Sequence, residues 1–309
     1  MIRITSGKNP VVKEIRSLRS RRERYDRGLY FIEGARFVAE ALNESGATGN
    51  AQDKGEMFSA GSVLGTGNKP DAGSMYGIMG NKPDAGSMPD IRYVVVSDSF
   101  AGGDGYETII RPCLDRDIRV YSVADSLFES VSDTDNPQGV LAVLGLKRES
   151  MKDAALRDGI VVILDGIRDP GNMGTIIRTA DAAGCAAVVV TNGCVDLFNP
   201  KVLRSTMGSV FHLPVLHCGN TLEAVDICRR KGFLVCASHI EGSVDIYDAD
   251  LSGNVALVIG SEAEGVGDEV LDYSDMLIRI PMAGRAESLN AAVAAAVMIY
   301  EAVRQRSYR

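Results

Sequence analysis

The stretch Leu164-Asp-Gly-Ile-Arg-Asp-Pro-Gly-Asn-Met-Gly-Thr-Ile-Ile-Arg178-Thr-Ala180 decides the fold of this chain. The apolar run at residues 160–164 predicts a buried strand, and the spacing of apolar residues after Met173 predicts a helix. Glycine, proline and asparagine between them are typical of a tight loop. The stretch therefore predicts a strand–loop–helix unit of an α/β protein, with Arg178 two turns into the helix.

Two later segments have the same character. Residues 258–265 read Val-Ile-Gly-Ser-Glu-Ala-Glu-Gly, and residues 280–292 read Ile-Pro-Met-Ala-Gly-Arg-Ala-Glu-Ser-Leu-Asn-Ala-Ala. Each begins as an apolar strand and breaks into a loop of small and polar residues. In open α/β sheets, ligands bind in the loops at the carboxyl ends of the strands. The three segments together predict one ligand pocket.

Strands and helices alternate along most of the chain. In the second half we expect strands at 160–164, 186–190, 233–237, 255–259 and 276–280, and helices at 173–183, 200–207, 222–231 and 289–305. Nearly continuous apolar strands separated by helices predict a parallel sheet that is covered on both faces.

The first half of the chain predicts a smaller α/β unit. We expect a basic helix at 9–24, a helix at 34–42 and one at 125–131, and strands at 30–33, 91–97, 119–123 and 139–145. The charged residues 147–159 show no clear apolar period and predict a linker. The resulting domains are 1–146 and 160–309.

Residues 43–89 interrupt the first domain. The segment holds ten glycines, and residues 67–75 recur as residues 80–88. Such a composition offers too little apolar surface to offset the entropy lost on ordering, which predicts a flexible insertion. A glycine loop that cradles phosphate is the alternative.

The charge is unevenly distributed. The whole chain carries a net charge of −8, which argues against a generally basic nucleic-acid binder. Residues 1–36 hold ten lysines and arginines and four acids, a net +6, so the remainder is −14. The basic end either binds a polyanion or forms a solvated helix face.

Cysteine and histidine patterns give no metal or disulfide signal. The six cysteines form no C-x-x-C pair and the three histidines are scattered, so no metal site is expected. The amino end lacks the apolar stretch of a signal peptide, and the longest apolar run, residues 291–300, is too short to span a bilayer. We expect a cytoplasmic protein with no membrane partner.

An ordinary dinucleotide site is poorly supported. Residues 165–174 lack the G-x-G-x-x-G spacing, and the next strand ends in Val190-Thr-Asn-Gly rather than in an acid that would hold ribose hydroxyls. A nicotinamide-dependent oxidoreductase is therefore a weak alternative.

The loops themselves suggest a pocket of main-chain groups. Gly260 and Gly265 permit a close approach of backbone to a ligand, and Ser288 is a natural N-cap for the last helix. Arg178 carries a fixed charge and five donors, which suit a phosphate or a hydroxyl that loses its proton. The alternative is a surface salt bridge from Arg178 to Asp169 or Asp181.

These three segments resemble the signature motifs of the SpoU (TrmH) family of RNA ribose 2′-O-methyltransferases in the SPOUT superfamily. The resemblance covers residue 160 to the end, with the motifs in the family's order. Residues 31–42 and 136–140 resemble the family's small α/β substrate-binding domain. The insertion at 43–89 departs from the family pattern.

The resemblance implies a carboxyl-terminal parallel-sheet domain tied in a deep trefoil knot, with S-adenosyl-L-methionine bound in the knot and a homodimeric enzyme that shares its active site between chains. The separate amino-terminal domain favours ribosomal RNA as the substrate, since such a domain can bind a folded target by shape and phosphates. Transfer RNA as the substrate and a non-catalytic RNA-binding role are the alternatives. The residues that the resemblance implies are Asn172, Arg178, Glu262, Ser288 and Asn290 for catalysis, and Gly260, Ile280 and Leu289 for contact with the cofactor through main chain.

Overall fold

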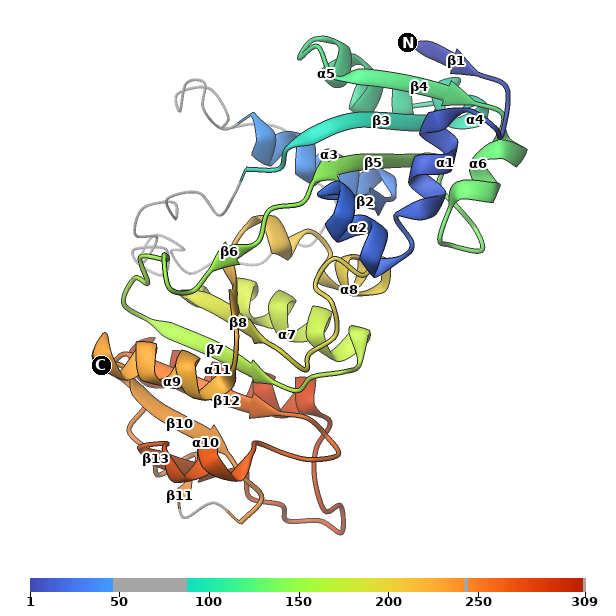
Figure 1. Ribbon diagram of the computed structural model, residues 1–309. Helices are drawn as coiled ribbons and strands as arrows, with labels where there is room; N and C mark the ends of the chain where they lie inside the picture. Colours follow the sequence, from blue (N-terminus) through green and yellow to red (C-terminus); the bar gives the residue numbers. More distant parts are fainter. Residues whose placement is uncertain (47–87, 242–243, 308–309) are drawn as a thin grey trace, which may run out of the picture.

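The computed structural model describes residues 1–46, 88–241 and 244–307. Two β-sheets, each covered by helices, occupy two lobes that meet at a narrower junction (Figure 1). Most of the predicted insertion at 43–89 lies outside the described residues. None of the helices in the described part of the chain combines the length and hydropathy that crossing a membrane requires.

The amino-terminal lobe holds a mixed five-stranded sheet of order β1-β4-β3-β5-β2. Its strands are β1 (Ile2–Ile4), β2 (Leu29–Glu33), β3 (Ile91–Ser97), β4 (Arg119–Val123) and β5 (Val140–Gly145). Its helices are α1 (Pro10–Ser17), α2 (Arg21–Arg27), α3 (Ala35–Ser45), α4 (Asp98–Ala101), η1 (Tyr106–Ile110), α5 (Arg111–Leu114) and α6 (Asp125–Val131). One face of the sheet packs on α1 and α6, and the other packs on α3, η1 and α5.

The single basic helix predicted at 9–24 is wrong, because the chain forms α1 and α2 with a break between them. Ser20 adopts an extended conformation before α2. The Arg24 guanidinium turns back to donate hydrogen bonds to the carbonyls of Leu18 and Arg19, both at 2.9 Å. These bonds satisfy main-chain groups that a continuous helix would have used differently.

The carboxyl-terminal lobe holds an eight-stranded sheet of order β11-β13-β10-β12-β7-β8-β9-β6. Its strands are β6 (Glu149–Ser150), β7 (Ile160–Asp165), β8 (Ala187–Thr191), β9 (Val215–Cys218), β10 (Leu234–Ser238), β11 (Val244–Asp245), β12 (Val255–Gly260) and β13 (Met276–Arg279). Every neighbouring pair is parallel, which confirms the predicted parallel sheet. The short strands β6, β9 and β11 had not been expected, and β6 falls within the predicted linker.

Helices cover both faces of this sheet, as predicted. They are α7 (Pro170–Ala182), α8 (Pro200–Thr206), η2 (Ser209–Phe211), α9 (Thr221–Arg230), α10 (Asp268–Asp272) and α11 (Ala291–Ser307). Alternate residues of β7 face opposite sides: Val162 and Leu164 pack with α7 and α11, whereas Val161 and Ile163 pack with α9 and α10. This alternation is the strand period of two, with both sets buried.

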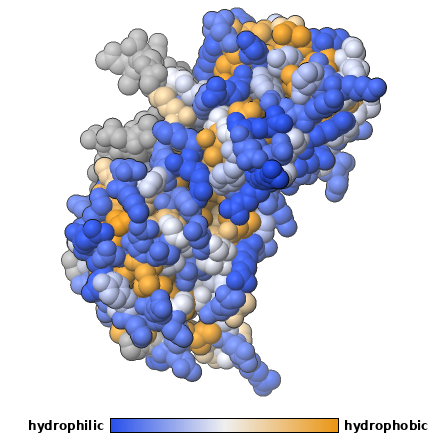
Figure 2. All heavy atoms as spheres, in the orientation of Figure 1, coloured by the Kyte–Doolittle hydropathy of each residue, from blue (hydrophilic) through white to orange (hydrophobic). Residues whose placement is uncertain are grey.

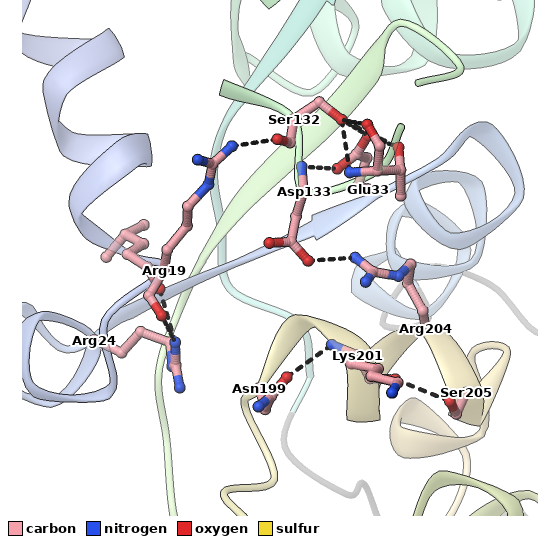
Figure 3. Close-up of polar contacts among 11 residues, drawn as sticks. Arg19, Arg24, Glu33, Ser132, Asp133, Asn199, Lys201, Arg204 and Ser205 are labelled. Atoms are coloured by element: carbon pink, nitrogen blue, oxygen red, sulfur yellow. Dashed lines mark hydrogen bonds and ion pairs between the residues drawn. The ribbon is translucent and has the colours of Figure 1, made fainter. Parts of the chain in front are cut away.

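The two lobes share a buried junction. Phe198 and Leu203 of the second lobe belong to the apolar core beneath the first sheet. Arg204 of α8 donates to the Asp133 carboxylate at 2.9 Å, across the junction drawn in Figure 3. Arg24 of α2, which is 2% exposed, pairs with Asp196. The lobes are therefore joined by apolar packing as well as by ion pairs.

Candidate active site

A cavity of about 350 Å³ opens at the carboxyl ends of β10, β12 and β13. The loop after β12 (residues 260–266) forms one wall, and the segment 278–291, which leads from β13 to α11, forms another. The first loop reaches the same place from the start of α7, because Asn172 bonds to both of the others. The structure thus brings the three segments singled out in the sequence together at one edge of the sheet.

Three polar side chains connect these loops. The Asn290 amide donates to Asn172 Oδ1 at 2.9 Å, and the Asn172 amide donates to the Glu262 carboxylate. Asp169 Oδ1 accepts from the Asn172 backbone N–H at 2.8 Å, which caps α7. Each of the three predicted polar residues therefore orients the next. Glu262 lines the cavity, whereas Asn172 and Asn290 reach it only through this hydrogen-bonded chain.

The expected helix cap at Ser288 is wrong. Helix α11 begins at Ala291, and Asn290 Oδ1 accepts from the backbone N–H groups of Ala292 (3.0 Å) and Val293 (3.3 Å). Asparagine caps helices as well as serine does, and it lies at the position that the helix start requires. Ser288 instead lies on the cavity wall.

The predicted cofactor contacts Gly260, Ile280 and Leu289 all line the cavity. At Gly260 the reason for glycine differs from the one expected. A Cβ there would lie 2.1 Å from the carbonyl carbon of Gly265, so the absent side chain leaves room for the loop's own backbone. The Gly265 N–H closes this loop on the Ser261 carbonyl at 2.9 Å.

Carboxylates dominate the rim of the cavity. Among its lining residues are Glu262, Glu264, Asp268 and Glu287, whereas Arg279, a lining cation, pairs with Asp245. Apolar side chains form the deeper wall, notably Ile259, Leu289 and Met298. A negative rim favours a cationic ligand and disfavours a dinucleotide with its phosphates.

Three further contacts fix the loops and had not been predicted. Asp165, the last residue of β7, accepts from the Thr221 hydroxyl at 2.6 Å and from the Gly267 N–H at 3.1 Å. Arg168 donates to the Glu264 carboxylate at 3.2 Å. The position of Asp165 directly after the apolar run 160–164 was the only sequence signal for this role.

Arg178 is not brought to the cavity within its own chain. It is exposed on α7, does not line the cavity, and makes no hydrogen bond or ion pair with a residue in the described ranges. The salt bridges considered from the sequence do not form, because Asp169 caps α7 and Asp181 binds His212. Arg178 lies six positions after Asn172, which places the two side chains about 120° apart around the helix axis.

Cysteine chemistry has no support at the cavity. All six cysteines are free and five are buried, and burial raises the pKa of Cys185, Cys228 and Cys236 to about 12.

Away from the cavity, the described residues include one group whose possible metal-ligand atoms lie within 4.8 Å of one another, formed by Glu40, Glu44 and His212. His212 of this group pairs with Glu40 and Asp181 and does not line the cavity.

Known proteins resemble the whole chain. A model of the SpoU rRNA methylase family matches residues 159–300, the substrate-binding model for RNA 2′-O-ribose methyltransferases matches residues 85–149, and an MRM3-like substrate-binding model matches residues 9–49. The Bacillus subtilis 23S rRNA (guanosine(2553)-2′-O)-methyltransferase RlmP is 32% identical over 97% of this chain and 98% of its own.

Solved structures agree with this similarity. The AdoMet-bound rRNA methyltransferase from Sinorhizobium meliloti is 30% identical with a TM-score of 0.75, and the alignment covers 98% of this chain and 97% of that one. The SpoU methyltransferase AviRb from Streptomyces viridochromogenes, in complex with AdoMet, is 25% identical with a TM-score of 0.73, over 97% and 98% of the two chains. The chain belongs to the SpoU family and is an S-adenosylmethionine-dependent RNA 2′-O-ribose methyltransferase.

Proposed function

We propose that this enzyme methylates the 2′-hydroxyl of a ribose in ribosomal RNA. The convergence of the three loops on one cavity carries the proposal for the reaction. The proposal for the substrate rests on the RlmP relative, which matches nearly the full length of the chain and acts on 23S rRNA by its name. The separate five-stranded lobe suits a large folded RNA, which proteins recognise by shape and backbone.

The cavity fits S-adenosyl-L-methionine. Its volume of about 350 Å³ lies within the range of small-molecule sites, roughly 300–1,000 Å³. When bound, S-adenosylmethionine supplies a methyl group carried on a positively charged sulfur. Main-chain groups at Gly260, Ile280 and Leu289 would hold the adenosyl part, and the carboxylates of the rim would favour the positive charge.

The polar chain at the rim would position the substrate. Glu262 holds Asn172, and Asn172 holds Asn290, so the three cannot rotate independently. A ribose hydroxyl is a weak nucleophile, and a positioned group that assists its deprotonation contributes roughly 10²–10⁴-fold. We assign that assistance to Arg178, whose guanidinium would stabilise the developing oxyanion or the adjacent phosphate while the hydroxyl proton passes to solvent water. Ser288 lies in the cavity wall, where it would contact the bound cofactor or ribose.

Arg178 can serve this role only from a partner subunit, which supports a homodimer. Helix α11, which packs against α7, presents Val293, Ala296, Val297 and Tyr300 on its outer side, and Val293 and Tyr300 are each 49% exposed. Positions i, i+3, i+4 and i+7 share one face of a helix. An exposed apolar stripe on a helix that packs against α7 fits a symmetric interface, which would carry Arg178 to the partner's cavity.

The remaining assignments are also proposals. We assign residues 1–146 to an RNA-binding domain and residues 160–309 to a methyltransferase domain, supported by their separate sheets. The fold similarity to SpoU structures supports a deep trefoil knot in the second domain. A ribosomal RNA substrate supports a cytoplasmic location for the enzyme.

The substrate is tested with purified protein, labelled S-adenosylmethionine and unmodified transcripts of 23S rRNA and of transfer RNAs. We expect a single ribose of 23S rRNA to be methylated, as mapped by primer extension. Methylation of transfer RNA alone would overturn the ribosomal assignment, and RNA retention without methyl transfer to any transcript would overturn the reaction itself.

The shared site is tested with mixed dimers. Arg178→Ala and Asn172→Ala should each lose nearly all methyl transfer as homodimers. If Arg178 acts in the partner's cavity, random mixing regenerates one intact site in half of the dimers, which restores about a quarter of the wild-type activity. No recovery in verified mixed dimers would show that both residues act within one chain.

A further inference from the structure

A second cavity of about 250 Å³ lies at the carboxyl ends of β8 and β9, in the seam between the two lobes. We call it the seam cavity. Arg21 and Tyr25 of α2 form one wall, Lys147 and Arg148 from the segment between β5 and β6 form another, and His217 of β9 closes a third side. Figure 2 shows hydrophilic side chains gathered over α2 beside this seam.

The seam cavity has an excess of positive charge. Arg21, Lys147 and Arg148 form no ion pair with any residue that the structure places. The wall holds two carboxylates, those of Asp196 and Glu149. Asp196 already accepts hydrogen bonds from the buried Arg24 and, at 2.7 Å, from the Tyr25 hydroxyl. Unpaired cations around a hollow favour an anionic ligand.

The same wall offers groups that recognise a nucleoside. The Arg21 and Arg148 guanidinium carbons lie 5.6 and 5.5 Å from the centre of the Tyr25 ring, so two planar cations are held against an aromatic side chain. The His217 Nδ1–H donates to the Val190 carbonyl at 2.9 Å, which leaves Nε2 without a partner among the described residues. Unstacked RNA bases stack on guanidinium planes, and the edges of the bases form hydrogen bonds with polar side chains such as His217.

Only one turn separates the seam cavity from the methyltransferase cavity. A Cβ at Gly193, in the seam cavity wall, would lie 3.9 Å from the Cα of Gly166. A Cβ at Gly166 would in turn lie 3.9 Å from the Cβ of Ser261, in the wall of the other cavity. Both glycines have positive φ, at 95° and 67°, which permits the tight turns that bring the cavities together.

We propose that the seam cavity binds a nucleotide of the RNA substrate near the ribose that is methylated. Its phosphate would bind Arg21, Lys147 and Arg148, and its base would enter the cavity toward His217. The inference rests on the proposed RNA methylation and adds to it a specific RNA subsite, formed by both lobes and distinct from the cofactor cavity.

The test compares Arg21→Ala/Arg148→Ala with Arg22→Ala, a neighbour on α2 that pairs with Asp26 and does not line the seam cavity. The double variant should raise the KM for 23S rRNA about tenfold or more and lower the salt slope of RNA binding by about 2, because two phosphate contacts are lost. The calorimetric Kd for S-adenosylmethionine should stay within twofold. Arg22→Ala should leave the KM within about twofold.

Wild-type methylation with an unchanged KM in the double variant, or an equal KM rise in Arg22→Ala, would overturn the subsite and leave the reaction standing. Absence of wild-type methylation on every transcript would instead overturn the proposed function. If the double variant does not fold, Lys147→Glu carries the same test, since Lys147 is exposed and unpaired in the described structure. An unchanged RNA KM in Lys147→Glu would also refute the subsite.

Discussion

His212 should make the lobe junction sensitive to alkaline pH. Its ring bonds to Asp181 of α7 and to Glu40 of α3, each at 2.9 Å. The bond to Asp181 raises the pKa of His212 from its ordinary 6.5 to about 9, burial opposes this shift, and the bond to Glu40 adds to it. A protonated His212 therefore holds a carboxylate from each lobe.

The direction of the effect follows from linkage. Because the pKa is higher in the folded protein, the stabilisation is complete below pH 6.5 and is lost as the pH rises through about 9. A shift of this size corresponds to about 3.4 kcal/mol at full strength. Since His212 is 33% exposed, solvent screening reduces the expected contribution to about 1–2 kcal/mol.

The assay is urea unfolding of the wild type and of His212→Gln at pH 6.5 and pH 10. We expect the variant to be less stable by about 1–2 kcal/mol at pH 6.5 and nearly equal to the wild type at pH 10. His239→Gln, which removes an imidazole that has no carboxylate partner in the described structure, is the control. A His212→Gln deficit that is the same at both pH values would refute the reasoning.

Two further substitutions test the loops and the junction. Gly260→Ala should lower the affinity for S-adenosylmethionine more than tenfold and the free energy of unfolding by about 1–3 kcal/mol, because the new Cβ would displace the backbone at Gly265. Gly253→Ala, where a Cβ meets open space, is the control in the calorimetric measurement. Equal affinities in the two variants would contradict the argument. Asp196→Asn should lower the free energy of unfolding, measured in urea, by about 3–5 kcal/mol, since Arg24 keeps its buried charge without a counterion. A loss below about 1 kcal/mol would contradict the role of this ion pair.

Much of the fold was predictable because local signals agree. The strand at 91–97 and the helix at 125–131 occur with the predicted bounds, since apolar periodicity and turn residues mark both ends. The strand β6 was missed because it has only two residues, and β9 because His217 interrupts its short apolar run. Their place in the sheet comes from pairing with distant strands, which no local pattern reports.

The site was predictable as a set of loops and not as a set of contacts. The main-chain turns around Gly260 and the polar residues Asn172 and Asn290 stand out in the sequence. The bond between Asn172 and Asn290 joins positions 118 residues apart, so only the fold determines it. The direction in which Arg178 points likewise depends on how α7 is rotated about its axis in the fold. The sequence spacing indicated how far the side chain lies from the loop and not which way it points.

The junction between the lobes has a consequence for how a target is chosen. Arg24 with Asp196, Arg204 with Asp133, and His212 between Glu40 and Asp181 fasten the lobes at separate points around a shared apolar core. These contacts oppose a hinge motion, so the distance between the RNA-binding surfaces of the two lobes stays fixed. A nucleic acid whose contact points do not already match that spacing must deform to bind both lobes, so its shape and deformability would affect which target is chosen.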